Sequence, residues 1–210
     1  MLKKTFIFLI LSFLLFISCN SNKAIRIDTL KTNLTGKTLQ SPSGNCIVDY
    51  DEIDKITGKR ITGLKQETIF TYTNENLKKY FTNRPFMTGE ASLSKTNDGI
   101  VFLNLFFIID TKYIKVWYNG IAAKNMMRIT MINGDKVFLE NVLNDTGEND
   151  LKNNKLIYRA VFPVNKSDLK ILKKHEIDKI GVLWNGGFEE YNIYNIDFFI
   201  RQYDCLKRIK

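Results

Sequence analysis

Residues 127–139 constrain the fold more than any other part of the chain. An Asn133-Gly134 pair divides this segment into two short arms rich in apolar residues. Asn-Gly is favoured in the two-residue turns of β-hairpins, because both central residues there need positive φ. In the first arm apolar and polar residues alternate, a period typical of a half-buried strand. The segment therefore predicts two antiparallel strands and favours a β-rich fold.

Other segments have the same character. Residues 92–95 and 100–109 flank an Asp98-Gly99 turn, and the second arm is apolar enough for a central strand covered on both faces. About eight strands with few helices favour a mainly β fold, either an antiparallel β-sandwich or an open barrel. The further strands are predicted at residues 112–118, 156–164, 177–184 and 191–203.

One short helix is predicted at about residues 167–175. Ser167 is expected to cap it, with Asp168 in the first turn and lysines near the last. A second helix is predicted at residues 75–81. His175 falls at the C-terminus of the first helix, where we expect a capping role because a catalytic histidine needs a nucleophile nearby.

The first residues have the layout of a signal peptide. Lys3 and Lys4 precede an apolar run over residues 5–17, and Ser18-Cys19 follows just before the chain turns polar. The segment Leu-Phe-Ile-Ser-Cys19 resembles a lipobox, although its phenylalanine departs from the usual leucine. We therefore expect residues 1–18 to be a signal peptide and Cys19 to carry the lipid. The alternatives are an ordinary secretory signal or an uncleaved anchor.

This leader sets the expected organisation and location. Residues 19–45 are polar and are predicted to be a flexible tether, and residues 46–210 to be a single β-rich domain. Acyl chains on Cys19 would hold the protein on a membrane, since each buried methylene contributes about 0.8 kcal/mol. The expected location is the cell envelope, at the outer membrane or on the periplasmic side.

Cys46 and Cys205 remain after Cys19 is assigned to the anchor. A pair of cysteines in an oxidising compartment favours a disulfide, and two free thiols are the alternative. Neither cysteine belongs to a C-x-x-C motif, and the lone His175 does not complete a zinc site. We expect no metal site and no cofactor.

The formal net charge of +9 raises the question of nucleic acid binding. The basic residues are mostly scattered lysines, and arginine, which suits bidentate phosphate contacts, is sparse. Export argues further against such a role, so no nucleic acid partner is expected.

Several motifs resemble small uncharacterised lipoproteins of the Bacteroidetes group. They are the Cys46 strand with its Asp-Lys-Ile-Thr-Gly58 end, the Asn133-Gly134 hairpin, residues 167–180, and a last segment ending at Cys205. The resemblance covers most of residues 46–206. It implies a lipid-anchored β-domain and brings no functional residues with it.

Two groups of residues are candidate sites. The acidic residues Asp49, Asp51, Glu52 and Asp54 could serve acid–base chemistry or hold Ca²⁺. The basic residues Lys55, Lys59 and Arg60 follow them, which favours ion pairs at a solvated strand end. Glu189 and Glu190 beside Tyr191 and Trp184 could form a platform for sugar rings, with Trp184 and Trp117 as ligand-facing aromatics and with Tyr113 and Tyr118 as further members. Aromatic residues in strands more often belong to the core or to cross-strand pairs.

The sequence shows no catalytic constellation that would identify a reaction. We therefore expect a non-enzymatic binding or structural accessory of the cell envelope, attached to the membrane by lipid. Its partner would be an envelope protein or a glycan. A carbohydrate-binding accessory and an immunity or inhibitor protein are the alternatives, and a hydrolase is less favoured.

Overall fold

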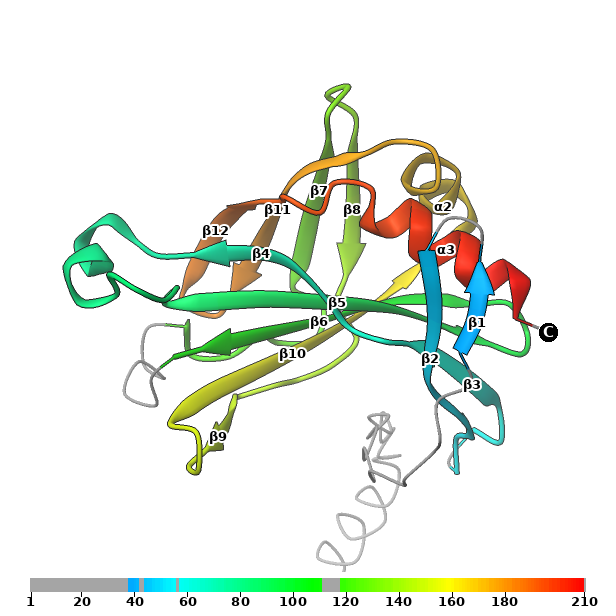
Figure 1. Ribbon diagram of the computed structural model, residues 1–210, viewed down its shortest axis with the longest axis horizontal. Coiled ribbons are helices and arrows are strands. Elements are labelled where there is room, and N and C mark those ends of the chain that lie inside the picture. Colours follow the sequence, from blue (N-terminus) through cyan, green and yellow to red (C-terminus); the bar gives the residue numbers. More distant parts are fainter. Residues whose placement is uncertain (1–37, 42–43, 56, 111–117, 210) are drawn as a thin grey trace, which may run out of the picture.

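The computed structural model describes residues 38–41, 44–55, 57–110 and 118–209. Its strands form two antiparallel sheets, and three helices accompany them (Figure 1). The helices are η1 (Glu75–Tyr80), α2 (Lys166–Leu172) and α3 (Phe198–Arg208). The strands are β1 (Thr38–Ser41), β2 (Gly44–Ile53), β3 (Arg60–Leu64), β4 (Glu67–Tyr72), β5 (Met87–Thr96), β6 (Val101–Ile109), β7 (Met126–Met131), β8 (Lys136–Glu140), β9 (Glu148–Asp150), β10 (Lys155–Val164), β11 (Ile177–Trp184) and β12 (Gly187–Asn192).

The large sheet has the strand order β1-β2-β3-β5-β6-β10-β9, and β4 pairs with β5 beside β3. It curls into a half-barrel. The small sheet has the order β12-β11-β7-β8. In Figure 1 the small sheet, α2 and α3 lie on the same side of the large sheet. The predicted fold class, a mainly β protein with antiparallel sheets, is confirmed.

Aromatic rings fill much of the space between the two sheets. The ring centres of Phe107 on β6 and Trp184 on β11 lie 4.7 Å apart. Phe70 on β4 stacks on Tyr191 of β12, with 4.5 Å between the ring centres. All four side chains are nearly inaccessible to water. Because rings of this size each bury a large apolar area, they supply much of the hydrophobic stabilisation between the sheets.

The predicted hairpins are confirmed. β7 and β8 pair across Asn133-Gly134, where Gly134 has a φ of 89° but Asn133 lacks the positive φ expected of a two-residue turn. β5 and β6 pair across Asp98-Gly99 over nine residue pairs. β6 is less covered than expected, because its side chains alternate between buried and half-buried along its whole length.

Side chains close the edge of β10 beyond its short pairing with β9. The Arg159 amide donates to the Asp145 carboxylate and the Val161 amide to the Asn141 side chain, each at 2.9 Å. The Val142 amide in turn donates to the Val161 carbonyl. The Arg159 amide and both polar backbone groups of Val161 are therefore paired at this edge, where β8 and β10 of the two sheets come close together.

The C-terminal segment corrects the predicted strand at residues 191–203. Only β12 continues into it, as far as Asn192, and α3 then occupies Phe198–Arg208. The side chains of Phe198, Gln202 and Leu206 are buried, a spacing of four that puts them on one face of a helix. Short apolar runs do not distinguish strand from helix, and this one was assigned wrongly.

A disulfide and two side-chain hydrogen bonds are among the contacts that hold α3 in place. A disulfide joins Cys46 on β2 to Cys205, with Cα atoms 5.7 Å apart and the two cysteines 159 positions apart in sequence. The Lys95 ammonium donates to the Leu206 carbonyl at 2.8 Å, and so satisfies a carbonyl at the helix C-terminus. Gln202 accepts from the buried Leu93 amide at 2.8 Å.

Gln202 fills a gap in the large sheet. β3 and β4 pair with successive parts of β5 along the same edge, and Leu93 lies where the partner changes. The Gln202 amide group also donates to the Lys65 carbonyl and to the Glu67 carboxylate, each at 2.9 Å. Its side chain therefore replaces the missing strand-to-strand hydrogen bonds.

The helix predicted at about residues 167–175 is present, but its bounds and its cap differ from the prediction. It is α2, and its cap is Asn165, whose side chain accepts from the Asp168 amide at 2.9 Å. Ser167 instead donates to the Asn165 side chain. The second predicted helix is present as η1, a 3₁₀ helix.

The folded region begins earlier than the predicted boundary at Cys46. β1 pairs with β2 from Thr38↔Ile47 to Ser41↔Gly44, so part of the expected tether forms a hairpin. The signal peptide, Cys19 and the rest of the tether lie outside the described residues, as does nearly all of the predicted strand at 112–118.

Candidate binding site

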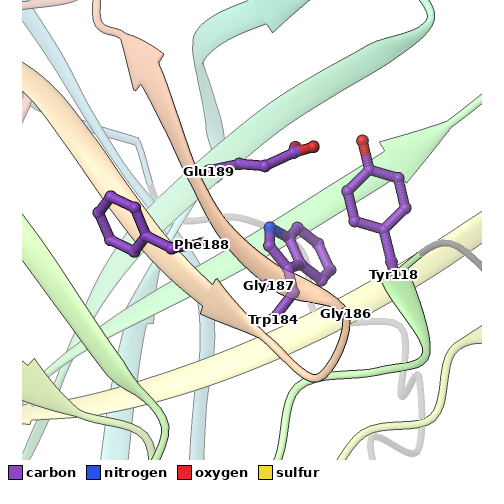
Figure 2. Close-up of a pocket in the computed structure, with 6 residues that line it drawn as sticks. All are labelled: Tyr118, Trp184, Gly186, Gly187, Phe188 and Glu189. Atoms are coloured by element: carbon purple, nitrogen blue, oxygen red, sulfur yellow. The ribbon is translucent and has the colours of Figure 1, made fainter.

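A small pocket opens beside the β11–β12 turn. Its volume is about 130 Å³, room for about four water molecules at about 30 Å³ each. We call it the Glu189 pocket, and its lining residues are Tyr118, Trp184, Gly186, Gly187, Phe188 and Glu189 (Figure 2).

The turn that shapes this pocket is fastened to the loop that follows Tyr118. The Asn185 amide donates to the Gly120 carbonyl at 2.9 Å, and its side chain to the Asn119 carbonyl at 2.8 Å. The Gly186 amide donates to the Tyr118 carbonyl at 3.2 Å. Asn119 and Gly120 have φ of 49° and 93°, in the left-handed region that these two residue types tolerate best. These bonds fix the position of the Tyr118 ring.

Gly187 leaves the space that becomes the pocket. It pairs with Trp184 across the hairpin, so a side chain there would project on the same face of the sheet as the indole. A Cβ built on Gly187 meets no atom within 4 Å. Its φ of 139° is also one that other residues rarely adopt.

The polar wall of the pocket is a chain of hydrogen bonds. The Trp184 indole nitrogen donates to the Tyr191 hydroxyl at 3.0 Å, and that hydroxyl donates to the Glu189 carboxylate at 2.7 Å. Figure 2 shows the Glu189 side chain passing over the indole, with its carboxylate directed toward the Tyr118 hydroxyl. Phe188 projects from the other side of β12.

Both tyrosines beside this carboxylate are held in the protonated state. Burial is the main cause that raises the pKa of Tyr118, and the negative charge of Glu189 adds to it. Burial likewise raises the pKa of Tyr191, assisted by Tyr118 and by Glu189. A phenol with a raised pKa keeps its proton at neutral pH, so both hydroxyls are hydrogen-bond donors.

The opposite side of the small sheet presents an apolar surface. We call it the outer face, and its exposed apolar side chains come from all four strands. Phe138 and Phe188 are 54% and 49% exposed, larger fractions than are usual for phenylalanine. The four apolar members are Met126, Phe138, Leu183 and Phe188.

Arg128 lies among these residues. Its guanidinium carbon is 5.0 Å from the centre of the Phe188 ring, a cation–π contact, and it pairs with Glu190 at 3.0 Å. The Phe188 ring in turn covers Gly181, where a Cβ would come within 2.2 Å of it. The buried Arg128 Nε has no hydrogen-bond partner in the described part of the chain.

The two aromatics predicted to face a ligand have different outcomes. Trp184 is 2% exposed, and its ring contacts Phe107, Tyr118 and Tyr158, so it offers no free face for a sugar ring to stack on. Only its accessible edge lines the pocket. Trp117 lies outside the described residues.

The two predicted glutamates are separated by the sheet. Glu189 lines the pocket, whereas Glu190 lies on the outer face, where it pairs with Arg128 and with Lys179. Successive residues of a strand point to opposite faces, so this separation could have been deduced once β12 was known. The role of Gly187 depends on the hairpin register and had no signal in the sequence.

Three of the remaining candidates, Asp51, Asp54 and His175, have structural partners. Asp51 pairs with Arg60 at 2.5 Å, and the hydrogen bond from this guanidinium is the main cause that lowers the pKa of Asp51. The Asp54 carboxylate accepts from the Thr57 amide in the β2–β3 turn. His175 lies 3.4 Å from the Asn133 side chain, just beyond α2. Among the residues that the structure describes, no three His, Cys, Asp or Glu side chains are grouped as metal ligands.

No protein-family model, curated protein or solved structure matches this chain. Within the described ranges, no helix has both the length and the apolar character needed to cross a membrane.

Proposed function

We propose that this protein is an exported bacterial lipoprotein that is anchored through Cys19, and that its β-domain binds a partner at the cell envelope without catalysing a reaction. The outer face carries this proposal. Met126, Phe138, Leu183 and Phe188 gather there from four adjacent strands, and exposed apolar groups that gather in one place mark interaction surfaces more often than scattered ones do.

Charges within the outer face suit a protein partner. Arg128 and Lys179 lie beside Glu190, and Lys136 and Glu140 are exposed on β8. An apolar centre among charges of both signs is the usual composition of a protein interface. An envelope protein is therefore the favoured partner, and an immunity or inhibitor protein would use such a surface in the same way.

Support for the anchor comes from the leader. A cationic start, an apolar run over residues 5–17 and a small residue before Cys19 form the layout of a cleaved signal. The lipobox-like segment that ends at Cys19 adds the acylation site. The proposed location is the cell envelope, at the outer membrane or on its periplasmic side.

Metabolic labelling with a fatty acid tests the anchor. Cys19→Ala should abolish the label and release the protein from membranes, whereas the double variant Cys46→Ala/Cys205→Ala should keep both. Unchanged labelling of Cys19→Ala would refute the lipoprotein assignment, and loss of label from the double variant would show that the assay reports folding instead.

Co-purification from the native envelope tests the binding surface. Phe138→Asp/Leu183→Asp should lose the proteins that wild type recovers, because two charges then replace the apolar centre. Ile53→Asp is the matched control, since Ile53 is 66% exposed and belongs to β2 of the large sheet. Equal recovery by all three chains would rule out the outer face as the binding surface.

A glycan is the second candidate for the ligand, and the Glu189 pocket is the observation that favours it. A carboxylate and a tyrosine hydroxyl beside an indole edge are groups that bind sugar hydroxyls. The same co-purification, scored for bound glycans, tests this alternative.

A further inference from the structure

We propose that the Glu189 pocket is a binding site for a primary ammonium group on a short alkyl chain. Nothing in this inference depends on the lipid anchor or on the outer face. The argument rests on the charge of Glu189, on the groups around it and on the size of the space.

Glu189 is a half-buried carboxylate without a basic partner. Within the described residues, no nitrogen of a Lys, Arg or His side chain is placed within 4.0 Å of its oxygens. The chain has 31 Lys and Arg against 22 Asp and Glu, so basic residues are not scarce. Removing a carboxylate from water is costly unless a cation or several hydrogen bonds compensate for it. A bound cation would complete this site.

The hydrogen bonds already present leave capacity on the carboxylate. An ionised carboxylate has about four acceptor positions. The Tyr191 hydroxyl donates to one oxygen at 2.7 Å, and the Tyr118 hydroxyl lies against the same group. The remaining acceptor positions suit the N–H donors of an ammonium group, which carries three of them.

The charge of the carboxylate favours a cation over a neutral ligand. Tyr118 and Trp184, whose ring centres lie 4.5 Å apart, line the pocket beside it. The Trp184 ring is covered by Phe107, Tyr118 and Tyr158, so the indole offers no free face for a cation–π contact. The attraction therefore comes from the carboxylate, which forms stronger hydrogen bonds with a positive group than with a neutral sugar hydroxyl.

The volume limits the ligand to a single small group. At about 130 Å³ the pocket is well below the range of about 300–1,000 Å³ for whole small molecules. An alkylammonium end enters such a space, and the rest of its molecule remains outside.

Glu190 provides a matched control on the same strand. It has the same charge as its neighbour, but it projects to the outer face and pairs with Arg128 at 3.0 Å and with Lys179 at 3.9 Å. Neutralising Glu190 therefore removes the same formal charge and leaves the pocket intact.

Titration of the full chain with n-butylammonium tests the proposal. Binding is measured by calorimetry and, in a Trp117→Phe background, by the fluorescence of Trp184. Saturable binding is expected, with little or none for uncharged n-butanol. Glu189→Gln should weaken binding about tenfold or more, as expected for a hydrogen bond to a charged group. Glu190→Gln should change it less than about twofold, because a screened surface charge contributes little.

Three further probes define the ligand class. Nα-acetyl-lysine methylamide and phosphoethanolamine carry the ammonium group on a peptide and on a lipid headgroup, and saturable binding of either supports the proposal and indicates the source. Tetramethylammonium has no N–H donors and should bind more weakly than n-butylammonium.

Several results would overturn this inference. They are equal binding of n-butanol and n-butylammonium, no effect of Glu189→Gln, or tighter binding of methyl α-glucoside, which would make the pocket a sugar site. None of these results bears on labelling at Cys19 or on co-purification through the outer face. The failure of one proposal is therefore distinguishable from the failure of the other.

Discussion

Replacing Gln202 with methionine tests how the C-terminal helix is joined to the large sheet. Methionine has a similar length and fits a buried site, but it removes both polar ends of the side chain. The Leu93 amide then loses its acceptor inside the protein, at a residue with no exposed surface. The Lys65 carbonyl and the Glu67 carboxylate each lose one donor.

The expected loss of stability follows from these three bonds. A buried amide without a partner costs about 1–3 kcal/mol, and a hydrogen bond to a charged group contributes about 1.5–3 kcal/mol. The Lys65 carbonyl can turn to water, because Lys65 is exposed, so its share is small. We expect Gln202→Met to lower the free energy of unfolding by about 3 kcal/mol, and the Tm by about 6–12 °C.

Urea unfolding followed by circular dichroism measures this change, and an unchanged m-value would show that the comparison is valid. Lys207→Gln is the control on the same helix, because Lys207 is 56% exposed and contacts only residues of its own helix, Asp204 and the Tyr203 ring, among the described side chains. That variant should lose less than about 0.5 kcal/mol. A loss below about 1 kcal/mol for Gln202→Met would refute the reasoning. So would a Leu93 amide that exchanges its hydrogen as slowly in the variant as in wild type.

Three further predictions concern stability. Removing the disulfide with Cys46→Ala/Cys205→Ala should destabilise the domain by up to about 5 kcal/mol, as measured by urea unfolding. This is the chain-entropy value for a loop closed by residues 159 apart. If the intact mass does not rise by the two thiol hydrogens on reduction, the bond itself is contradicted. Burial disfavours the charge on Glu67, but hydrogen bonds, first from Arg201 and then from Gln202, outweigh it and lower its pKa. The stabilisation from the Glu67 carboxylate is therefore present above its unfolded pKa of about 4.3, and it is lost as the pH falls through the lower folded pKa. Glu67→Gln should flatten the acid side of a profile of stability against pH. An unaltered profile would count against the pairing of Glu67 with Arg201 and Gln202. Gly89→Ala should cost about 1–3 kcal/mol or more, since its Cβ would lie 2.0 Å from the buried Phe70 ring; a melting temperature equal to that of wild type would show that the ring can move aside.

Local signals in the sequence were enough for the hairpins. Gly134 adopts positive φ in a turn between two arms of clear period, so neither distant contacts nor burial had to be known. α3 could not be separated from a strand in the same way. Phe198 and Phe199 belong to a short apolar run, and the choice of helix depends on packing against β5 and on the distant cysteine of β2.

The candidate site was partly accessible from the sequence. Glu189 and Trp184 were recognised as neighbours with binding chemistry, because they lie close together in the chain. The burial of Trp184 in the core could not be predicted from the sequence, because it depends on Phe107 and Tyr158 from the other sheet. The fastening of the turn by Asn185 likewise joins residues 66 apart in sequence. Contacts between residues so far apart in the chain produce no periodic pattern in the sequence.

The closed edge of β10 affects the tendency of the protein to aggregate when many copies lie close together. An open strand edge offers a row of amides and carbonyls to any neighbouring chain, and thereby invites aggregation. Here Asn141 and Asp145 occupy that row with their own side chains. If the domain is confined to a membrane surface, its copies meet far more often than they would in free solution. These two residues then protect the protein against joining its neighbours edge to edge.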